Sequence, residues 1–410
     1  MNFALNKKLI IIMVGLPARG KSYTSNNLQR YLSWCGMKCG VFNSGKLRRE
    51  TYPNSSFAEF FNPNNSTYSE IREQISEKCF QNMLNWLNDE GNIGIFDATN
   101  TTIHRRSKLL NLIKESKLNS KTIFIEIISN NKSIIENNLK LKLMSQDFLH
   151  ISSDFALTDF NLRLKYYENK YQEINNDENI NYIKLIKENN SIITHNVYGA
   201  IESMITSYLQ NLKINKNPIY ISRHGESIYN TEDRIGGDSL LTSKGYDYSF
   251  KLYEFIKKEI NDNFDNFYTI TSCLKRTILT GKHFNTNNKQ CNLLNEINGG
   301  ICEHMTYQEV KNKYPEIYEA RKKNKLKFRY PQGESYLDLL EKLKLFVLNI
   351  ECMQTPFLII AHRAIIRILL AYFMDIDLVD VPNIDIPLNH VIKLTPSSDK
   401  YKLEYIKLII

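Results

Sequence analysis

Short apolar runs and longer amphipathic stretches alternate along the chain, and the alternation occurs twice. In the first half, the apolar runs predict strands at Leu9–Val14, Lys38–Phe42, Ile93–Phe96, Lys121–Ile128 and Tyr182–Leu185. The amphipathic stretches between them predict helices at Lys21–Trp34, Ser69–Leu87 and Asp159–Tyr171. Strands and helices that alternate at this spacing indicate right-handed crossovers and a mainly parallel sheet.

A polar stretch, Asn211–Asn217, precedes Pro218 and separates this half from a second one. The alternation then restarts, with strands predicted at Ile219–Ser222, Phe267–Thr271, Phe357–Ala361, Val391–Leu394 and Tyr401–Ile409. A chain of 410 residues is long enough for two domains of roughly 200 residues each. We therefore expect two independent α/β domains, residues 1–213 and 214–410.

Composition narrows the class of protein. Hydrophobic residues make up 42% of the chain and charged residues 24%, as in an ordinary globular protein. The seven cysteines include no C-x-x-C pair, which argues against a zinc site or a disulfide framework and favours reduced thiols in the cytoplasm. The run Leu9–Val14 has no cleavage site after it, and no stretch approaches the ~18 apolar residues of a membrane span.

The net charge of +9 has two explanations. Stretches rich in Lys and Asn, at 129–145 and 174–190, indicate a general compositional bias. Attraction to polyanionic substrates is the functional alternative, and we assign it to the basic residues inside motifs. Nucleic-acid binding is not expected, because no dense basic run is interleaved with aromatic residues.

A glycine-rich loop follows the first predicted strand and precedes the first predicted helix. It has the pattern G-x-x-x-x-G-K-[ST], formed by Gly15, Leu16, Pro17, Ala18, Arg19, Gly20, Lys21 and Ser22. In this context the backbone N–H groups and the helix N-terminus face phosphates. Lys21 would reach the β- and γ-phosphates and Ser22 would hold Mg²⁺. The alternative, an incidental glycine turn, does not explain the strand before it.

An acidic residue and several arginines accompany this loop. Asp97 ends the predicted strand Ile93–Phe96, at the edge of an open sheet where ligands bind. Asp97 could hold Mg²⁺ through water or accept a proton from a hydroxyl, or it could only cap the next helix. Arginines suited to a phosphorylated acceptor follow nearby, at Arg48-Arg49, Arg72 and Arg105-Arg106.

The second half carries a different phosphate chemistry. The strand Ile219–Ser222 leads into Arg223-His224-Gly225. A neutral imidazole is a nucleophile toward phosphorus and forms a phosphohistidine. Later strand ends add two cationic groups and a proton donor, namely Arg276, His362 and Glu296. Such groups supply the charge that a metal would otherwise supply, so no cofactor is expected here. A core histidine with surface ion pairs is the alternative.

Together these residues resemble the bifunctional 6-phosphofructo-2-kinase/fructose-2,6-bisphosphatase family over nearly the whole chain. The resemblance is carried by MVGLPARGKS, VFNSGKLRRE, FDATNTT with RR, ISRHGES, RIGGDS, LNEI, MTYQE, RYPQGESY and LLAYF. It implies an N-terminal P-loop kinase that makes fructose 2,6-bisphosphate from ATP and fructose 6-phosphate. It also implies a C-terminal histidine phosphatase, similar to phosphoglycerate mutase in fold, that degrades this product. The expected role is to regulate glycolysis in the cytoplasm.

For the kinase, the resemblance implies ATP with Mg²⁺, and it implies roles for particular residues. Residues Gly15–Tyr23, Asn137 and Lys142 match the ATP site, with Lys21 and Asp97 catalytic and Ser22 and Asp97 at the metal. Positions that match the fructose 6-phosphate site are Arg48, Arg72, Thr99, Arg105, Arg163 and Tyr167.

For the phosphatase, His224 matches the nucleophile and Glu296 the proton donor, with Arg223, Asn230, Arg276 and His362 around the transferred phosphate. Positions that match contacts to the sugar and its 6-phosphate are Gly236, Tyr307, Arg321, Lys325, Tyr336 and Arg367, and we add Arg363 beside the pocket. The implied partners are small-molecule substrates, with no nucleic acid and no membrane, and a homodimer stays open.

The chain departs from the family at three positions. Leu47 stands where the family usually has Tyr, Ser129 replaces a Cys, and Arg363 replaces Gln in the H-Q-A segment. These departures leave a second interpretation open, in which one domain is catalytically inactive and acts as a scaffold or sensor. If the resemblance is set aside, the motifs alone also fit a nucleotide kinase fused to a broad phosphatase.

Overall fold

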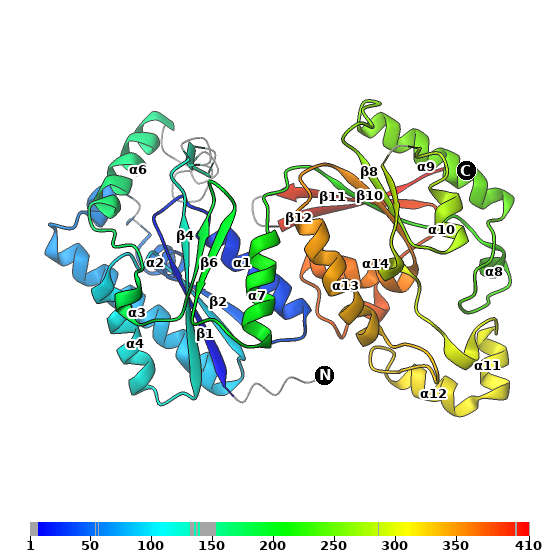
Figure 1. Cartoon of the computed structure of the whole chain (residues 1–410), viewed down its shortest axis with the longest axis horizontal. Coiled ribbons are helices and arrows are strands. Elements are labelled where there is room, and N and C mark those ends of the chain that lie inside the picture. Colours follow the sequence, from blue (N-terminus) through cyan, green and yellow to red (C-terminus); the bar gives the residue numbers. More distant parts are fainter. Residues whose placement is uncertain are drawn as a thin grey trace. The chain divides into compact units, whose positions relative to one another are not determined.

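The computed structural model describes residues 7–53, 55, 57–131, 135–136, 138–139, 153–285, 287–397 and 400–409. The chain forms two compact units, Met1–Gln210 and Asn211–Ile410. In the described part of each unit, six strands form one sheet and helices pack on it (Figure 1).

The N-terminal unit has the strand order β2-β3-β1-β4-β5-β6. Its strands are β1 (Lys8–Val14), β2 (Cys39–Asn43), β3 (Ile93–Asp97), β4 (Ser120–Ile128), β5 (Tyr182–Ile186) and β6 (Ser191–His195). Neighbouring strands run parallel except β5 and β6, which are antiparallel. The five predicted strands are confirmed, and β6 is an edge strand that the prediction missed.

The helices of this unit lie on both faces of its sheet. They are α1 (Lys21–Trp34), α2 (Ser44–Thr51), α3 (Ser66–Asp89), α4 (Ile103–Glu115), α6 (Ser153–Glu168) and α7 (Ala200–Asn211), with short 3₁₀ turns η1 (Ala58–Phe61) and η2 (Asn176–Glu178). The predicted helix at Lys21–Trp34 is confirmed. The predicted helix Ser69–Leu87 lies within α3, whereas α6 begins earlier and ends earlier than Asp159–Tyr171.

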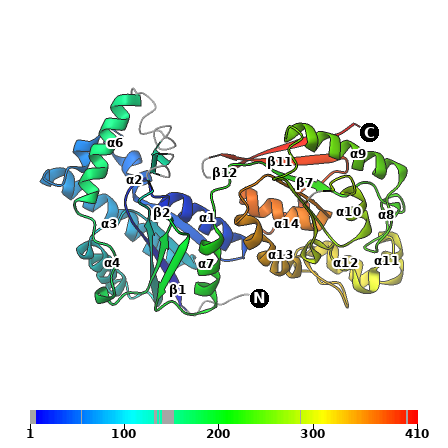
Figure 2. The same ribbon diagram turned by 45° about the horizontal axis from the view of Figure 1, so that its top comes forward.

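The core of the N-terminal unit is built around β1, which is apolar and buried from Leu9 to Val14. Such a strand has no solvent-facing side, as expected in the middle of a parallel sheet. Ile10 and Ile12 pack with Phe80 of α3 and Leu109 of α4. On the opposite face lie α1 and α7, as Figures 1 and 2 show. This burial fixes where β1 ends, and therefore where the loop after it begins.

The C-terminal unit has the strand order β12-β11-β7-β10-β8-β9. Its strands are β7 (Ile219–Arg223), β8 (Tyr268–Thr271), β9 (Asn288–Gln290), β10 (Phe357–Ala361), β11 (His390–Ser397) and β12 (Lys400–Lys407). Strands β7, β10, β8 and β9 are parallel, while β11 runs antiparallel to both β7 and β12. The five predicted strands are confirmed. The additional β9 consists of three exposed polar residues.

Helices surround this second sheet. They are α8 (Ile228–Thr231), α9 (Ser243–Glu259), α10 (Lys275–Thr280), α11 (Tyr307–Lys313), α12 (Pro315–Lys323), α13 (Tyr336–Glu351) and α14 (Arg363–Met374), with 3₁₀ turns η3 (Asn292–Leu294), η4 (Gly300–Cys302) and η5 (Val381–Asn383). Helix α14 begins directly after β10 and is buried from Ala364 to Phe373. None of the helices in the described ranges is long and apolar enough to cross a membrane.

Candidate functional sites

The glycine-rich loop lies between β1 and α1, as its sequence predicts. Gly15 has φ +135°, and a Cβ at this position would lie 2.6 Å from the carbonyl oxygen of Ile127. Gly20 has φ +91° and is the N-cap of α1, whose first turn contains no acidic residue. Only glycine adopts such φ values readily. The loop thus leads into a helix N-terminus without acidic residues in its first turn, a feature that suits the predicted phosphate site.

Two cations of this loop have different surroundings. The buried Lys21 folds back over the loop, and its Nζ donates to the carbonyl oxygen of Leu16 at 2.7 Å. Arg19 is also buried, but its Nη2 lies 3.5 Å from Glu168 at the end of α6. Burial lowers the pKa of Arg19, and Glu168 opposes that shift. Lys21 is therefore the loop cation placed where a phosphate would bind, and Arg19 links the loop to α6.

Only some of the remaining residues of the predicted ATP site lie in the described part of the structure. Ala18, at the tip of the loop with φ +57°, packs against Ala156 and Phe160 of α6. The predicted nucleotide residues Asn137 and Lys142 lie outside the described residues. The neighbouring Asn138 is described, and its Nδ2 donates to the carbonyl oxygen of Ala18 at 3.0 Å.

Ser22 and Asp97 approach the same amide group, that of Asn43. Asn43 and Asp97 are register partners at the ends of β2 and β3. The Asn43 Nδ2 donates to Asp97 Oδ2 and lies 3.5 Å from Ser22 Oγ, while its Oδ1 accepts from the N–H of Lys46 at 2.7 Å. The hydroxyl and the carboxylate that were predicted to hold a metal therefore lie near each other. Sequence analysis missed Asn43, although its position at a strand end was a usable signal.

Four residues of the predicted acceptor site gather around η1. The guanidinium carbon of Arg163 lies 3.5 Å from the ring centroid of Phe61, and that of Arg48 lies 5.0 Å from it. The Tyr167 ring centroid is 6.1 Å from the same ring. Arg72 donates to the carbonyl oxygen of Phe60. Burial lowers the pKa of Arg72, and Arg163 lowers it further while Tyr167 opposes the shift. The cluster is thus strongly cationic.

Thr99 and Arg105 lie on the other side of this region, after β3. The carbonyl oxygen of Thr99 accepts from the N–H of Gly15 at 3.0 Å, which ties the Asp97 loop to the phosphate loop. Arg105 pairs with Glu73, the neighbour of Arg72 on α3. Burial alone would raise the pKa of Glu73, but Arg105 and Lys108 hold it below its ordinary value.

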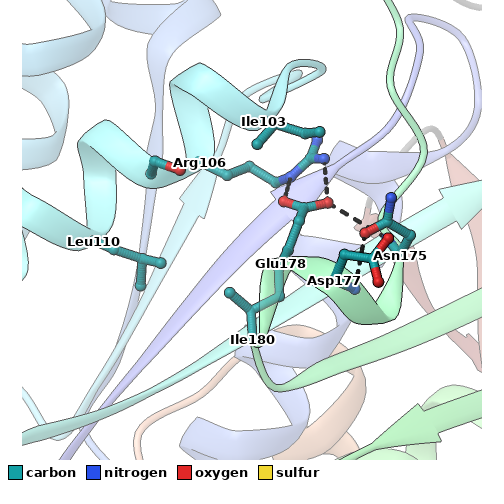
Figure 3. Close-up of a pocket in the computed structure, with 8 residues that line it drawn as sticks. Ile103, Arg106, Leu110, Asn175, Asp177, Glu178 and Ile180 are labelled. Atoms are coloured by element: carbon teal, nitrogen blue, oxygen red, sulfur yellow. Dashed lines mark hydrogen bonds and ion pairs between the residues drawn. The ribbon is translucent and has the colours of Figure 1, made fainter.

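Sequence analysis grouped Arg106 with the arginines suited to a phosphorylated acceptor. This grouping is wrong, because the Arg106 guanidinium binds other groups of the protein. Its Nε and Nη2 donate to the two carboxylate oxygens of Glu178 at 2.7 and 2.6 Å, and its Nη1 donates to the carbonyl oxygens of Asn100 and Gln172. Arg106 is fully buried. Figure 3 shows this pair at the wall of a cavity of about 410 Å³ between α4 and η2. Through these hydrogen bonds, the Arg106 guanidinium connects the loop after β3 with the segment after α6.

The candidate nucleophile of the second unit is buried and neutral. His224 directly follows β7, and its Nδ1 lies 2.8 Å from the carbonyl oxygen of Gly225. Because a carbonyl oxygen only accepts, Nδ1 carries the proton and Nε2 keeps its lone pair. Burial lowers the pKa of His224 far below 6.5, and Arg276 and Arg223 lower it further. The imidazole is therefore neutral, as the predicted nucleophile role requires.

His362 lies beside it, at the end of β10. The two ring centroids are 5.2 Å apart. The Nε2 of His362 is hydrogen-bonded to Ser272 Oγ at 2.8 Å, and within the described residues its buried Nδ1 has no hydrogen-bond partner. Burial, Arg276 and His224 all lower its pKa. Sequence analysis missed Ser272, although it directly follows β8.

Two arginines and one carboxylate face these histidines. Arg276 donates through Nη1 to the carbonyl oxygen of Gly237 at 2.7 Å. Burial lowers the pKa of Arg223 to about 10, and the nearby Glu296 opposes this shift. Glu296 opposes the lowered pKa of Arg276 in the same way. The predicted proton donor is therefore close to both predicted phosphate-binding arginines.

Four of the predicted sugar residues form two hydrogen-bonded pairs. Arg321 donates to the hydroxyl of Tyr307 at 3.0 Å, and Arg367 donates to that of Tyr336 at 3.0 Å. Arg363, the departure from the family, is half exposed, with its Nη2 3.9 Å from Asp385. Such an exposed pair contributes little to stability.

Asn230 and Gly236 have structural partners. The Oδ1 of Asn230 accepts from the N–H of Ser227 at 3.0 Å and completes the cap of α8. Gly236 has φ +65°, and a Cβ there would collide with the carboxylate of Glu303. Glu303 also accepts from the N–H of Gly237, whose carbonyl holds Arg276. The glycine pair therefore helps to position Arg276, and Glu303 is a residue that the sequence did not single out.

One short segment holds three of the pocket cations through backbone oxygens. The carbonyl oxygens of Pro382, Ile384 and Ile386 accept from Lys325, Arg367 and Arg223 at 3.1, 2.6 and 3.4 Å. We call residues 382–386 the carbonyl segment. Backbone acceptors carry no side-chain signature, so sequence analysis could not find them.

Each unit thus brings together residues of one predicted phosphate site, around the glycine-rich loop in the first unit and around His224 in the second. Residues 1–216 match the family described as 6-phosphofructo-2-kinase, and residues 219–408 match the histidine phosphatase superfamily (branch 1). The chain belongs to the 6-phosphofructo-2-kinase/fructose-2,6-bisphosphatase family. Members of this kinase family use ATP.

Two relatives illustrate the match. The chain is 40% identical to 6-phosphofructo-2-kinase/fructose-2,6-bisphosphatase 1 of Homo sapiens, across 98% of this chain and 85% of the relative. It is 38% identical to 6-phosphofructo-2-kinase/fructose-2,6-bisphosphatase 3 of Rattus norvegicus, across 98% and 72%. Among solved structures, the alpha-ribazole phosphatase of Shigella flexneri is 16% identical with a TM-score of 0.42, covering 47% of this chain and 98% of the phosphatase.

The buried pair of Arg106 and Glu178 yields a prediction about stability. Arg106→Leu leaves the Glu178 carboxylate buried without its partner, so we expect a loss of about 3–5 kcal/mol in the free energy of unfolding. The control is Lys38→Leu, which breaks the exposed pair with Glu90 and should cost at most about 1 kcal/mol. Both tryptophans, Trp34 and Trp86, lie in the N-terminal unit, so their fluorescence in urea reports its unfolding. Equal losses in both variants would contradict this role.

The two buried histidines predict a pH dependence of stability. Because their pKa values are lowered in the folded state, the unfolded chain binds more protons below about pH 6.5. The C-terminal unit should therefore lose stability as the pH falls below this value, by up to about 1.4 kcal/mol per histidine and pH unit. Hydrogen exchange of the β10 amides measures the slope. His362→Gln should flatten it, while the exposed His104→Gln should not. An unchanged slope in His362→Gln would refute the assignment.

Proposed function

We propose that this protein is a bifunctional enzyme of fructose 2,6-bisphosphate metabolism. Its N-terminal unit transfers the γ-phosphoryl group of ATP to the 2-hydroxyl of fructose 6-phosphate. Its C-terminal unit removes that phosphoryl group again. One observation carries the proposal: Lys21, Ser22 and Asp97 accompany an arginine cluster in one unit, and a neutral His224 accompanies Arg223 and Arg276 in the other.

In the kinase, catalysis consists mostly of positioning and charge compensation. We assign the ATP phosphates to Gly15–Tyr23, and the nucleotide also to Asn137 and Lys142. Lys21 would lie against the transferring phosphoryl group. Arg48, Arg72, Arg105, Arg163, Thr99 and Tyr167 would hold fructose 6-phosphate, since guanidinium groups bind phosphate through paired hydrogen bonds.

Mg²⁺ fits the oxygens near Asn43. The ion prefers hard oxygen ligands, and Ser22 Oγ and Asp97 Oδ2 both approach the single amide of Asn43. We propose that these two residues hold Mg²⁺, which would neutralise phosphate charge when bound. Asp97 would also orient the acceptor hydroxyl and take its proton.

In the phosphatase, His224 Nε2 would attack the phosphorus of the 2-phosphate. The P–N bond forms as the bond from phosphorus to the sugar oxygen breaks, and Glu296 gives that oxygen a proton. Water then hydrolyses the phosphohistidine. We propose that Arg223 and Arg276 compensate the charge of the transferring group, with the neutral His362 and Asn230 beside them, so that this step needs no metal.

The sugar and its 6-phosphate would bind to Gly236, Tyr307, Arg321, Lys325, Tyr336, Arg363 and Arg367. Arg363 adds a cation at the N-terminus of α14, where the helix dipole already favours an anion. We therefore propose that this departure from the family tightens phosphate binding. Leu47 packs in the hydrophobic core beside the acceptor site, and nothing in the structure explains Ser129.

We also propose a cellular location and an assembly for the enzyme. Reduced thiols persist in the cytoplasm, where we propose that this chain with seven cysteines acts. A homodimer is the proposed assembly, and sedimentation of the purified chain tests it.

The direct test of function is to incubate the protein with ATP and fructose 6-phosphate, and to follow the formation and decay of the 2-phosphate. AMP as the preferred acceptor would refute the sugar-kinase assignment.

Lys21→Met is expected to separate the two activities. The variant loses the cation that compensates the transferring phosphoryl group, so kinase turnover should fall about 100-fold or more. Phosphatase turnover should stay within twofold of the parent value, since the second site is built from other residues. Lys114→Met, an exposed change on α4, is the matched control. Kinase turnover that survives in Lys21→Met would show that the phosphate loop is assigned wrongly.

The phosphatase mechanism predicts a covalent intermediate. Brief exposure to fructose 2,6-bisphosphate labelled at the 2-phosphate should leave acid-labile label on the protein. His224→Ala should abolish both this label and the release of fructose 6-phosphate, whereas the exposed His104→Ala should change neither. Arg276→Ala should raise the barrier by about 2–4 kcal/mol. Glu296→Gln should form label slowly, because an amide cannot protonate the leaving oxygen. Full turnover by His224→Ala would overturn the mechanism.

A further inference from the structure

Lys325 is a partly buried lysine of the C-terminal unit, and its acceptor differs from that of the lysines that pair with carboxylates. Its Nζ donates to a neutral acceptor, the carbonyl oxygen of Pro382, at 3.1 Å. By contrast, Lys184, Lys342 and Lys393 donate to carboxylates. An ammonium group on a carboxylate is stabilised in its charged form, whereas one on a carbonyl gains much less. Lys325 therefore lacks the partner that usually keeps a lysine protonated.

The carbonyl segment brings this amine next to two guanidinium groups. Its carbonyl oxygens at residues 382, 384 and 386 accept from Lys325, Arg367 and Arg223 in turn. Pro382 lies in the 3₁₀ turn η5, and Ile384 follows directly after this turn. One short segment thus binds the three cations through groups that carry no net charge.

This arrangement changes the chemistry of the amine. Burial, together with the nearby Arg367, Arg321 and Arg363, lowers the pKa of Lys325 to about 8. Lys184, which contacts carboxylates, has a raised pKa instead. At pH 7.5, a lysine with a pKa of 8 is unprotonated in about a quarter of molecules, against about one in a thousand for an ordinary lysine. A free amine is a nucleophile toward carbonyl carbon.

We propose that Lys325 is a modification site for phosphorylated aldehydes. The neighbouring arginines bind the phosphate and hold the aldehyde carbon against Nζ. The amine adds its lone pair to that carbon, a proton moves from nitrogen to oxygen, and the carbinolamine loses water to leave an imine. No oxidant or reductant takes part, and water reverses the reaction. The bound phosphate selects this class of aldehyde over uncharged ones.

The modification has a consequence that rests on the proposed function. The adduct would occupy the position assigned to the 6-phosphate of the sugar and would remove one of its cations. Phosphatase turnover should fall with the extent of modification, and kinase turnover should not. Phosphorylated aldehydes would then shift the balance of the two activities toward synthesis.

The probe is pyridoxal 5′-phosphate, an aldehyde with a phosphate group. The full-length protein is incubated with it, the imine is reduced with borohydride, and peptides are mapped by mass spectrometry. Label should concentrate on Lys325 rather than on Lys322, Lys323 and Lys327, which are more exposed neighbours in sequence. Pyridoxal, without the phosphate, should label Lys325 at least about tenfold less, as expected from the loss of a charge-assisted hydrogen bond. Labelling should rise with pH around a midpoint near the pKa of about 8.

Two variants provide the controls. Lys325→Arg keeps the charge but should abolish the selective label, whereas Lys342→Arg, whose lysine pairs with Glu334, should leave it unchanged. Label spread evenly over the exposed lysines, or equal labelling by pyridoxal, would overturn the proposal. The labelling readout does not depend on turnover. Selective label on a protein that does not hydrolyse fructose 2,6-bisphosphate would therefore refute the proposed function and leave the modification site standing.

Discussion

In both units, the reactive groups lie where neighbouring parallel strands end. Parallel strands point the same way, so the residues that follow them meet at one edge of the sheet. In the first sheet, β1, β2 and β3 lead to the phosphate loop, Asn43 and Asp97. In the second, β7 and β10 lead to His224 and His362. The buried apolar runs that form these strands therefore decide which polar residues can act together.

At this edge of the second sheet, the two histidines are buried away from solvent, and this burial determines their protonation state. His224 and His362 are buried among arginines, so the neutral imidazole is the stable form in the folded protein. A neutral imidazole with a protonated Nδ1 is the form that a nucleophile requires. Burial is thus expected to lower the stability of the second unit in acid and, at the same time, to keep His224 neutral there. Stability and reactivity have one physical cause.

The sequence predicts the parts of this arrangement that depend on side-chain pattern. Buried strands, the glycine loop and the histidine motif are visible because apolar runs and rare residue combinations mark them. Strands β6 and β9 were missed, since one is a short antiparallel edge strand and the other consists of three exposed polar residues. Arg105 and Arg106 are adjacent in sequence, but successive residues of a helix point in different directions. Only the structure shows that Arg106 turns into the interior toward Glu178.

At the candidate phosphate sites, several cationic side chains have uncharged hydrogen-bond acceptors. Lys21, Arg72, Arg276 and Lys325 each donate to a backbone carbonyl oxygen, whereas the structural Arg106 pairs with a carboxylate. A carboxylate would have to be displaced before a phosphate could bind, and the displaced charge would remain buried. A carbonyl dipole orients the cation but leaves its full charge for the ligand. The consequence is a group of buried positive charges: burial, together with the neighbouring guanidinium groups, lowers the pKa of Arg223 and of Lys325. The charge that would attract phosphate is thus the same charge that favours the unprotonated amine of Lys325.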